Sequence, residues 1–185
     1  MDIKLDIDPT TPLAMDNLVN RAHLNIRESA LIRRIQEAFA GVKLGGGRSL
    51  NMTEYYDSYQ GASEYLEKAK HDERQDWRKI ADATLEQFTV TFSFTDVEGF
   101  RFYLPAYMIW TIRNHRTNNS IIGNYTIYAL DVDHPVFAKV GFVNAFTPEQ
   151  LNCIVDFLTY CVGHRGTCDA LVARRHLDKI RKLLP

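Results

Sequence analysis

The sequence predicts an α+β fold, rich in helix overall, in which a small antiparallel sheet packs against several helices. The segment FTVTFSF, residues 88–94, alternates apolar residues with Thr and Ser, as a half-buried strand does. The stretch TDVEG has the length and final glycine of a hairpin loop, and FRFYL after it resumes the alternation. We therefore expect a β-hairpin over about 88–104, with helices covering its apolar face.

Length and composition predict one globular domain. The chain has 185 residues, 45% hydrophobic and 24% charged, which is ordinary for a protein with a buried core. We expect residues 1–12 to be an N-terminal arm or linker and residues 13–185 to form a single domain. The formal net charge of −1 gives no overall field for nucleic acid or an anionic membrane, so both are disfavoured as partners.

The charges are unevenly distributed along the chain. Residues 53–99 contain eleven Asp and Glu against five Lys and Arg, whereas residues 164–185 contain six Lys and Arg against two Asp. The middle of the chain is thus acidic and rich in tyrosine, and its end is basic. The basic residues of the end lie in a predicted amphipathic helix, without the interleaved aromatic residues that single-stranded nucleic acid prefers.

The cysteines and the apolar segments predict a cytoplasmic protein. Cys153, Cys161 and Cys168 are three in number and are expected to be free thiols. The N-terminus lacks the basic and apolar regions of a secretion signal, and no apolar run is long enough to span a membrane. The spacing of Cys161, His164, Cys168 and His176 matches no zinc site, so no metal or other cofactor is expected.

The first half of the domain is expected to be helical up to the hairpin. An apolar stripe predicts a helix over 27–41 that Gly41 terminates. Three glycines at 45–47 connect it to two short helices divided at Gly61; the Lys and Ser or Thr of a phosphate-binding loop are absent. Asp76 and Asp82 are predicted N-caps, and Trp77 is predicted to cover the core.

The second half begins with a helix that Pro105 is expected to start, because proline suits the first turn. Over 120–146 helix and strand patterns compete, and we favour strands at 121–133 and 137–146. Thr147, Pro148 and Gln150 form a predicted capping box that opens a buried helix ending at Gly163. The basic amphipathic helix follows it.

Four motifs carry a resemblance to a known family. IQEAF, DERQDW, GFRFYLPAYM and FTPEQLNCIVDFLTY occur in this order over about residues 30–161. The chain resembles a family of small bacterial proteins known only as a domain of unknown function. Such a resemblance implies no reaction, cofactor or catalytic residue.

The candidate site is the polar face of the predicted hairpin. There Arg101 and Tyr103 would lie beside the hydroxyls of the first strand, with Asp72, Asp76 and Trp77 arriving from the preceding segment. The Arg fork and the hydroxyls suit an anionic ligand or an acidic group of a partner. The same pattern is typical of the wet face of an antiparallel sheet, with Arg101 paired to Asp76.

Two functions of different classes follow from these observations. The first is a small cytoplasmic interaction or accessory protein without catalysis, which fits the acidic, tyrosine-rich middle and the absence of a catalytic signature. The alternative is an enzyme or binding module that holds a small anion through Arg101. The sequence predicts neither the identity of a protein partner nor the oligomeric state.

Overall fold

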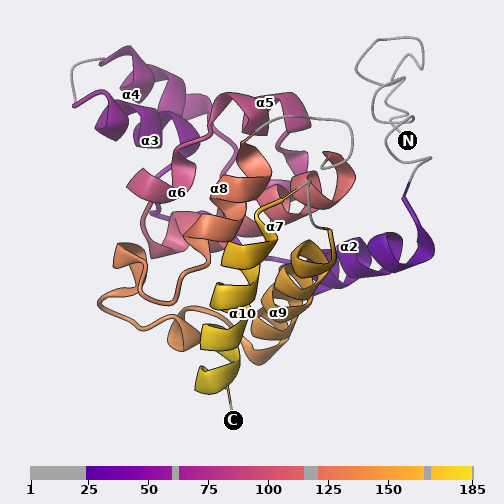
Figure 1. The fold of residues 1–185 in the computed structure, drawn as a ribbon. Coiled ribbons are helices and arrows are strands. Elements are labelled where there is room, and N and C mark those ends of the chain that lie inside the picture. The colour runs from indigo at the N-terminus through magenta and orange to yellow at the C-terminus, as the bar shows by residue number, and fades with distance from the viewer. Residues whose placement is uncertain (1–23, 60–62, 115–120, 165–167, 185) are drawn as a thin grey trace, which may run out of the picture.

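The protein, a computed structural model, is described over residues 24–59, 63–114, 121–164 and 168–184, and this part of the chain contains helices and no β-strand (Figure 1). The predicted α+β class is therefore wrong, and the predicted arm at 1–12 lies outside the described residues. The α-helices are α2 (Ile26–Ala38), α3 (Leu50–Asp57), α4 (Glu64–Lys68), α5 (Asp82–Gln87), α6 (Thr91–Phe94), α7 (Val97–Asn114), α8 (Ile122–Ala129), α9 (Pro148–Gly163) and α10 (Ala170–Leu183). Short 3-10 helices are η1 (Ala69–His71), η2 (Trp77–Lys79), η3 (Pro135–Phe137) and η4 (Val143–Ala145).

The predicted hairpin at 88–104 is instead the short helix α6 followed by the first half of α7. Most residues of α7 are buried, on all sides of the helix, so it shows neither helical nor strand periodicity. Pro105 lies inside α7 and does not begin it, so the Arg101 carbonyl lacks the N–H that residue 105 would otherwise donate. Burial of α7 in the core compensates for this loss.

Most of the helix ends predicted from the sequence are confirmed. The predicted helix at 27–41 is α2, and Gly41 follows it with φ +75°. In the predicted capping box of α9, the Thr147 hydroxyl accepts from the Gln150 backbone N–H and the Gln150 side chain accepts from the Thr147 N–H. Helix α10 is the predicted basic amphipathic helix. Asp82 was wrongly predicted as an N-cap, because it lies inside the first turn of α5.

The strands predicted within 120–146 are also absent. Residues 122–129 form α8, whose Gly123 allows close packing against Thr111 of α7. Residues 135–146 form η3, η4 and the turns around them. Their aromatic residues are not on a sheet; Phe137, Phe142 and Phe146 pack edge to face or tilted against one another in the core.

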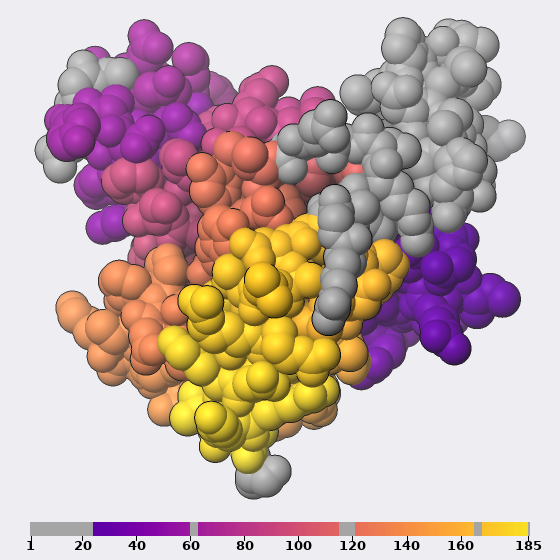
Figure 2. All heavy atoms as spheres, in the orientation of Figure 1, coloured from indigo at the N-terminus to yellow at the C-terminus, as the bar shows by residue number. Residues whose placement is uncertain are grey.

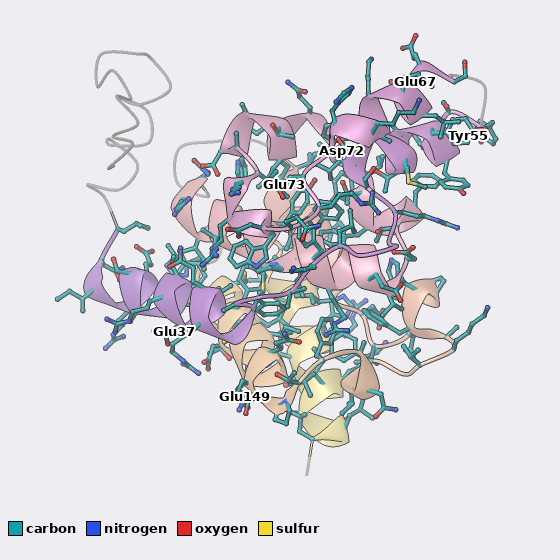
Figure 3. All side chains as sticks on the ribbon, turned by 180° about the vertical axis from the view of Figure 1, so that it is seen from behind. Glu37, Tyr55, Glu67, Asp72, Glu73 and Glu149 are labelled. Carbon is teal, nitrogen blue, oxygen red and sulfur yellow. The ribbon has the colours of Figure 1, made fainter. Side chains whose placement is uncertain are left out.

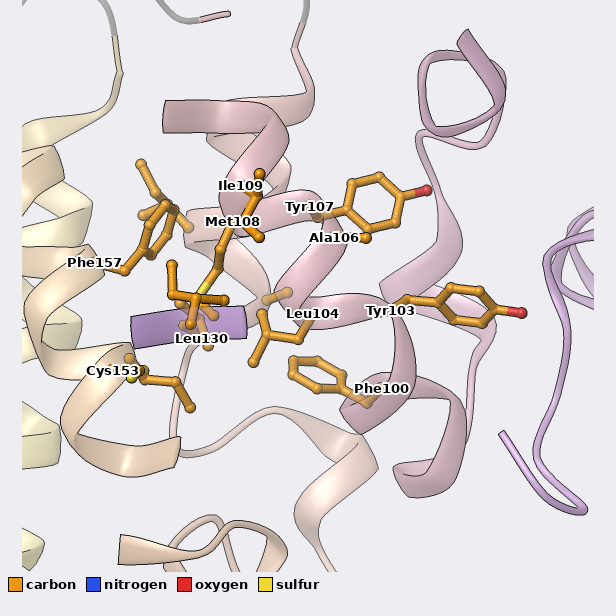
Figure 4. Close-up of a cluster of buried hydrophobic side chains, with 14 of the residues drawn as sticks. Phe100, Tyr103, Leu104, Ala106, Tyr107, Met108, Ile109, Leu130, Cys153 and Phe157 are labelled. Carbon is orange, nitrogen blue, oxygen red and sulfur yellow. The ribbon is translucent and has the colours of Figure 1, made fainter. Parts of the chain in front are cut away.

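Helix α7 is at the centre of the molecule. It packs against α2, α5, α8 and η2, and α9 packs between α2 and α10. Figure 4 shows Met108 and Ile109 of α7 on the side of Phe157 of α9, while the hydroxyls of Tyr103 and Tyr107 point the opposite way. Helices α3 and α4 form a hairpin at one end of the molecule, away from α9 and α10 (Figures 1 and 2).

Candidate functional site

Segment 72–77 contains three of the predicted site residues, Asp72, Asp76 and Trp77. It holds the glycine loop at 45–47 and the start of α3 in place. The Asp72 carboxylate accepts from the backbone N–H of Asn51 at 2.9 Å and from its side-chain amide at 2.6 Å. Arg74 donates from Nη2 to the carbonyls of Gly45 (2.7 Å) and Gly47 (2.9 Å). Asp72 is therefore engaged in fixing the start of α3.

Trp77 and Asp76 are also engaged within the protein. Trp77 is 3% exposed, in agreement with its predicted place over the core, and its Nε1–H donates to the Phe39 carbonyl at 2.9 Å. Asp76 caps η2 as predicted, accepting from the Arg78 N–H, and it pairs with the Arg78 guanidinium (Nε to Oδ1, 2.7 Å). This pair, and not the alternative pair with Arg101, lowers the pKa of the Asp76 carboxyl.

Gly47 and Gly99 bring the glycine loop onto the start of α7. The Asp96 carboxylate accepts from the backbone N–H of Arg48 (3.1 and 3.2 Å) and of Gly99 (2.9 Å). Arg48 also donates from Nη1 to the Phe94 carbonyl at 2.9 Å. These contacts join segments 45–48, 72–77 and 94–99 into one structural unit, which we call the loop clamp.

Tyr103 is a core residue. Its side chain is fully buried, and its hydroxyl forms no hydrogen bond of good geometry although the Leu50 amide lies near it. Burial, and secondarily the charge of Asp72, raise the pKa of Tyr103 far above its ordinary value. Asp72 and Tyr103 are thus the two predicted site residues that the structure brings into electrostatic contact.

Arg101 lies apart from the other predicted site residues. Two positions along a helix correspond to a rotation of roughly 200°, so Arg101 and Tyr103 of α7 do not share a face. Arg101 is half-buried, its Nε is buried without a hydrogen-bond partner, and no carboxylate of the described residues pairs with it. Because the sheet is absent, the single polar face that was predicted to gather these residues does not exist.

The α3–α4 hairpin, where the sequence predicted no site, is an exposed surface of the described chain. Its acidic side chains Asp57, Glu64 and Glu67 are exposed. Burial, and secondarily the negative charge of Asp57, raise the pKa of Glu54. Lys68 and Lys70 pair with Glu64 and Glu67 respectively. The acidic, tyrosine-rich composition of residues 53–73 was the available signal for this surface.

Tyrosines line the same hairpin. Tyr55 and Tyr56 pack edge to face with ring centroids 5.7 Å apart, and the Arg48 guanidinium lies 4.2 Å from the Tyr56 ring centroid. Tyr59 and Leu66 are 96% and 38% exposed, respectively. Helix α4 packs mainly on α3 and η1, so its outer side is free of other elements of the described chain.

Tyr59 has an unusual backbone conformation. It follows the C-cap of α3 with φ +55°, in the left-handed region where glycine is normally found after a helix. A tyrosine in this conformation costs roughly 1 kcal/mol relative to glycine. Since its ring is almost fully exposed, burial of the side chain does not offset that cost.

A family profile described as "Family of unknown function (DUF6714)" matches residues 27–172. The chain belongs to this family. The expected membership of a family known only as a domain of unknown function is thereby confirmed, whereas the match tests neither the four motifs nor a bacterial origin. Within the structure, DERQDW and the start of GFRFYLPAYM contribute Asp72, Arg74, Trp77 and Gly99 to the scaffold described above. No curated protein and no solved structure matched the chain.

No helix among the described residues is both long and apolar enough to cross a membrane. Within the same residues, no three His, Cys, Asp or Glu side chains converge as the ligands of a metal ion would.

Proposed function

We propose that the protein is a non-catalytic interaction or accessory protein that contacts its partner through the α3–α4 hairpin. The observation that carries this proposal is the state of Tyr59. Its aromatic ring is almost fully exposed to solvent, and its backbone has a conformation that is unfavourable for tyrosine. Tyrosine is enriched at protein interfaces because it offers a large, rigid apolar surface with a polar tip. A role in binding accounts for a residue that folding does not favour.

The charge of the hairpin predicts the chemistry of the partner. Asp57, Glu64 and Glu67 are exposed on the same hairpin as Tyr59, and Lys68 and Lys70 pair with the two glutamates. The carboxylate of Asp57 in particular would attract a partner with Lys or Arg on its contact surface. Nucleic acid is repelled by the same carboxylates. We place this interaction in the cytoplasm, because Cys153, Cys161 and Cys168 form no disulfide bond with one another, as expected in a reducing compartment.

Charge reversal on the hairpin tests the proposal. The variant D57K/E67K places lysines near the C-terminal ends of α3 and α4, where the helix dipole favours a cation, so the fold is retained. The tagged variant and the tagged wild-type protein are purified from their native cells, and the proteins recovered with each are measured by quantitative mass spectrometry. We expect the amount of the specific partner recovered with the variant to be at least about tenfold lower than with the wild type.

The matched control is E37K/D178K. Glu37 and Asp178 are exposed on α2 and α10, and the double substitution changes the net charge by the same amount. Figure 3 shows Glu37 at the end of the molecule remote from Tyr55 and Glu67. Equal loss of the partner in both variants, or equal retention, contradicts a contact through the hairpin.

Arg101 supports a second candidate function, the binding of a small anion. The Arg101 guanidinium is half-buried and has no carboxylate partner among the described residues, so a bound anion would compensate its charge and could accept from its buried Nε–H. Millimolar inorganic phosphate is then expected to raise the melting temperature of the wild-type protein and of the control Arg33→Met, but not of Arg101→Met. Arg33 is exposed on α2, so an equal rise in all three proteins identifies a general salt effect and contradicts the site.

A further inference from the structure

A concave surface lies between α6 and η3, next to segment 94–99 of the loop clamp. It is a cleft of about 430 Å³ lined by Ser93, Thr95, His134, Pro135 and Val136. Figure 2 shows α6 and the 131–146 segment as neighbours on one face of the molecule. The volume is in the range of a small-molecule site.

The hydrogen-bonding state of His134 follows from its position as N-cap of η3. Its Nδ1 accepts from the backbone N–H of Val136 at 3.2 Å. A backbone N–H can only donate, so the proton of the neutral imidazole is on Nε2. Burial lowers the pKa of His134, against a smaller opposing effect of Asp131, so the ring is neutral at neutral pH.

The imidazole is held in place by aromatic neighbours. Its ring centroid lies 5.9 Å from that of Phe100 and 6.1 Å from that of Phe137. No described residue hydrogen-bonds to Nε2. His134 therefore presents one fixed N–H donor that the protein itself does not use.

Ser93 provides the second polar group of the cleft. Its side chain is exposed, so its hydroxyl can donate to a ligand acceptor. The Thr95 hydroxyl does not serve this purpose, because its Oγ1 is buried and lies against Gly99 of α7. Among the described residues, no charged side chain lines the cleft.

This arrangement does not suit nucleophilic catalysis by Ser93. A general base must accept the proton of the hydroxyl, whereas Nε2 of His134 already carries a proton and Nδ1 is engaged by Val136. What the cleft offers is hydrogen-bond donors for an acceptor oxygen beside the apolar surface of Pro135 and Val136.

We propose that this cleft binds a small uncharged ligand through a carboxamide carbonyl, which accepts from His134 Nε2–H and a neighbouring hydroxyl while its apolar body lies on Pro135 and Val136. An anion is disfavoured because the cleft has no cation to compensate its charge. A cationic ligand without an acceptor oxygen is also disfavoured, because it leaves the His134 Nε2–H and the neighbouring hydroxyl without a hydrogen-bond acceptor. This binding site is distinct from the α3–α4 hairpin and does not depend on the proposed interaction there.

Three nearly isosteric probes test the proposal by NMR titration of the full chain at neutral pH. Benzamide carries the neutral carbonyl, benzoate is its anionic counterpart, and benzamidinium is a cation without an acceptor. We expect saturable shifts at His134 with benzamide and a Kd of about 1 mM. Benzoate is expected to bind at least about fivefold more weakly, and benzamidinium not to bind.

Two variants locate the binding. His134→Asn keeps a side-chain acceptor for the Val136 N–H but removes the Nε2–H donor, so benzamide affinity should fall at least about tenfold. Ser93→Ala removes the exposed hydroxyl of the cleft, and the affinity for benzamide should fall severalfold. His71→Asn, at an exposed histidine, should bind as the wild type does.

Any one of three outcomes would overturn the proposal. The first is the absence of saturable benzamide shifts in the wild-type protein. The second is an unchanged benzamide affinity in His134→Asn, and the third is benzamidinium binding as tightly as benzamide, because either of these results removes the Nε2–H donor from the interaction.

Discussion

Replacing Gly99 by alanine is expected to lower the free energy of unfolding by about 3 kcal/mol or more. A Cβ at this position would lie 2.0 Å from Thr95 Oγ1 and 2.8 Å from the Arg48 carbonyl oxygen. The Arg48 carbonyl belongs to a backbone segment whose N–H is held by Asp96, so it cannot move away without disturbing the loop clamp. Alanine normally stabilises the interior of a helix by roughly 1 kcal/mol relative to glycine, so close approach of the backbones reverses the usual sign.

The glycine loop itself provides the control. A Cβ on Gly46 meets no atom within 4 Å, and its φ is not in the left-handed region. Gly46→Ala should therefore change stability by no more than about 0.5 kcal/mol. Urea denaturation followed by circular dichroism measures both variants, and a Gly99→Ala protein as stable as Gly46→Ala contradicts the packing of the loop on α7.

Trp77→Ala is expected to cost about 4 kcal/mol, because it empties a buried aromatic site and leaves the Phe39 carbonyl without its donor. Trp77→Phe keeps most of the apolar contact and loses only the hydrogen bond, so about 1–2 kcal/mol is expected. The same denaturation measurement separates the two effects. A loss below about 1 kcal/mol for Trp77→Ala would show that Trp77 is a surface residue available for binding.

Both predictions concern residues of the motifs by which the chain resembles its family. Asp72, Arg74, Trp77 and Gly99 hold the glycine loop, α2 and α7 together. Their contacts with other parts of the protein give these residues a structural role. The proposed contact surface and the proposed cleft use other residues, chiefly Tyr59 and His134.

Local signals in the sequence predicted the helix ends well. The Thr147 capping box, Gly41 after α2 and the Asp76 cap depend on hydrogen bonds or backbone angles within a few residues, and the structure has all three. The amphipathic α10 was predictable because one of its faces is solvated.

The central helix was not predictable from the same signals. Helix α7 is buried all round, so its apolar pattern carries no period, and the alternation in residues 88–94 is too short to distinguish a strand from a buried turn of helix. Pro105 favoured a helix start because proline inside a helix is rare. Tertiary packing overrode both preferences.

The candidate sites were only partly accessible from the sequence. Acidic and tyrosine-rich composition marked residues 53–73, but the left-handed conformation of Tyr59 depends on how α3 ends. His134 followed by Pro135 is a recognisable signal for an N-cap and the first residue of a helical turn. Ser93 and Thr95, however, lie about forty positions earlier in the chain. Only the folded structure shows that these residues line one cleft with His134.

Photo-crosslinking in living cells tests the contact through the α3–α4 hairpin most directly. A p-benzoylphenylalanine at position 59, and for comparison at position 26, replaces Tyr59 or Ile26, which are exposed to similar extents at remote places on the molecule. A discrete crosslinked product is predicted from position 59 and none from position 26. A product from position 26 without one from position 59 would contradict the hairpin as the contact surface.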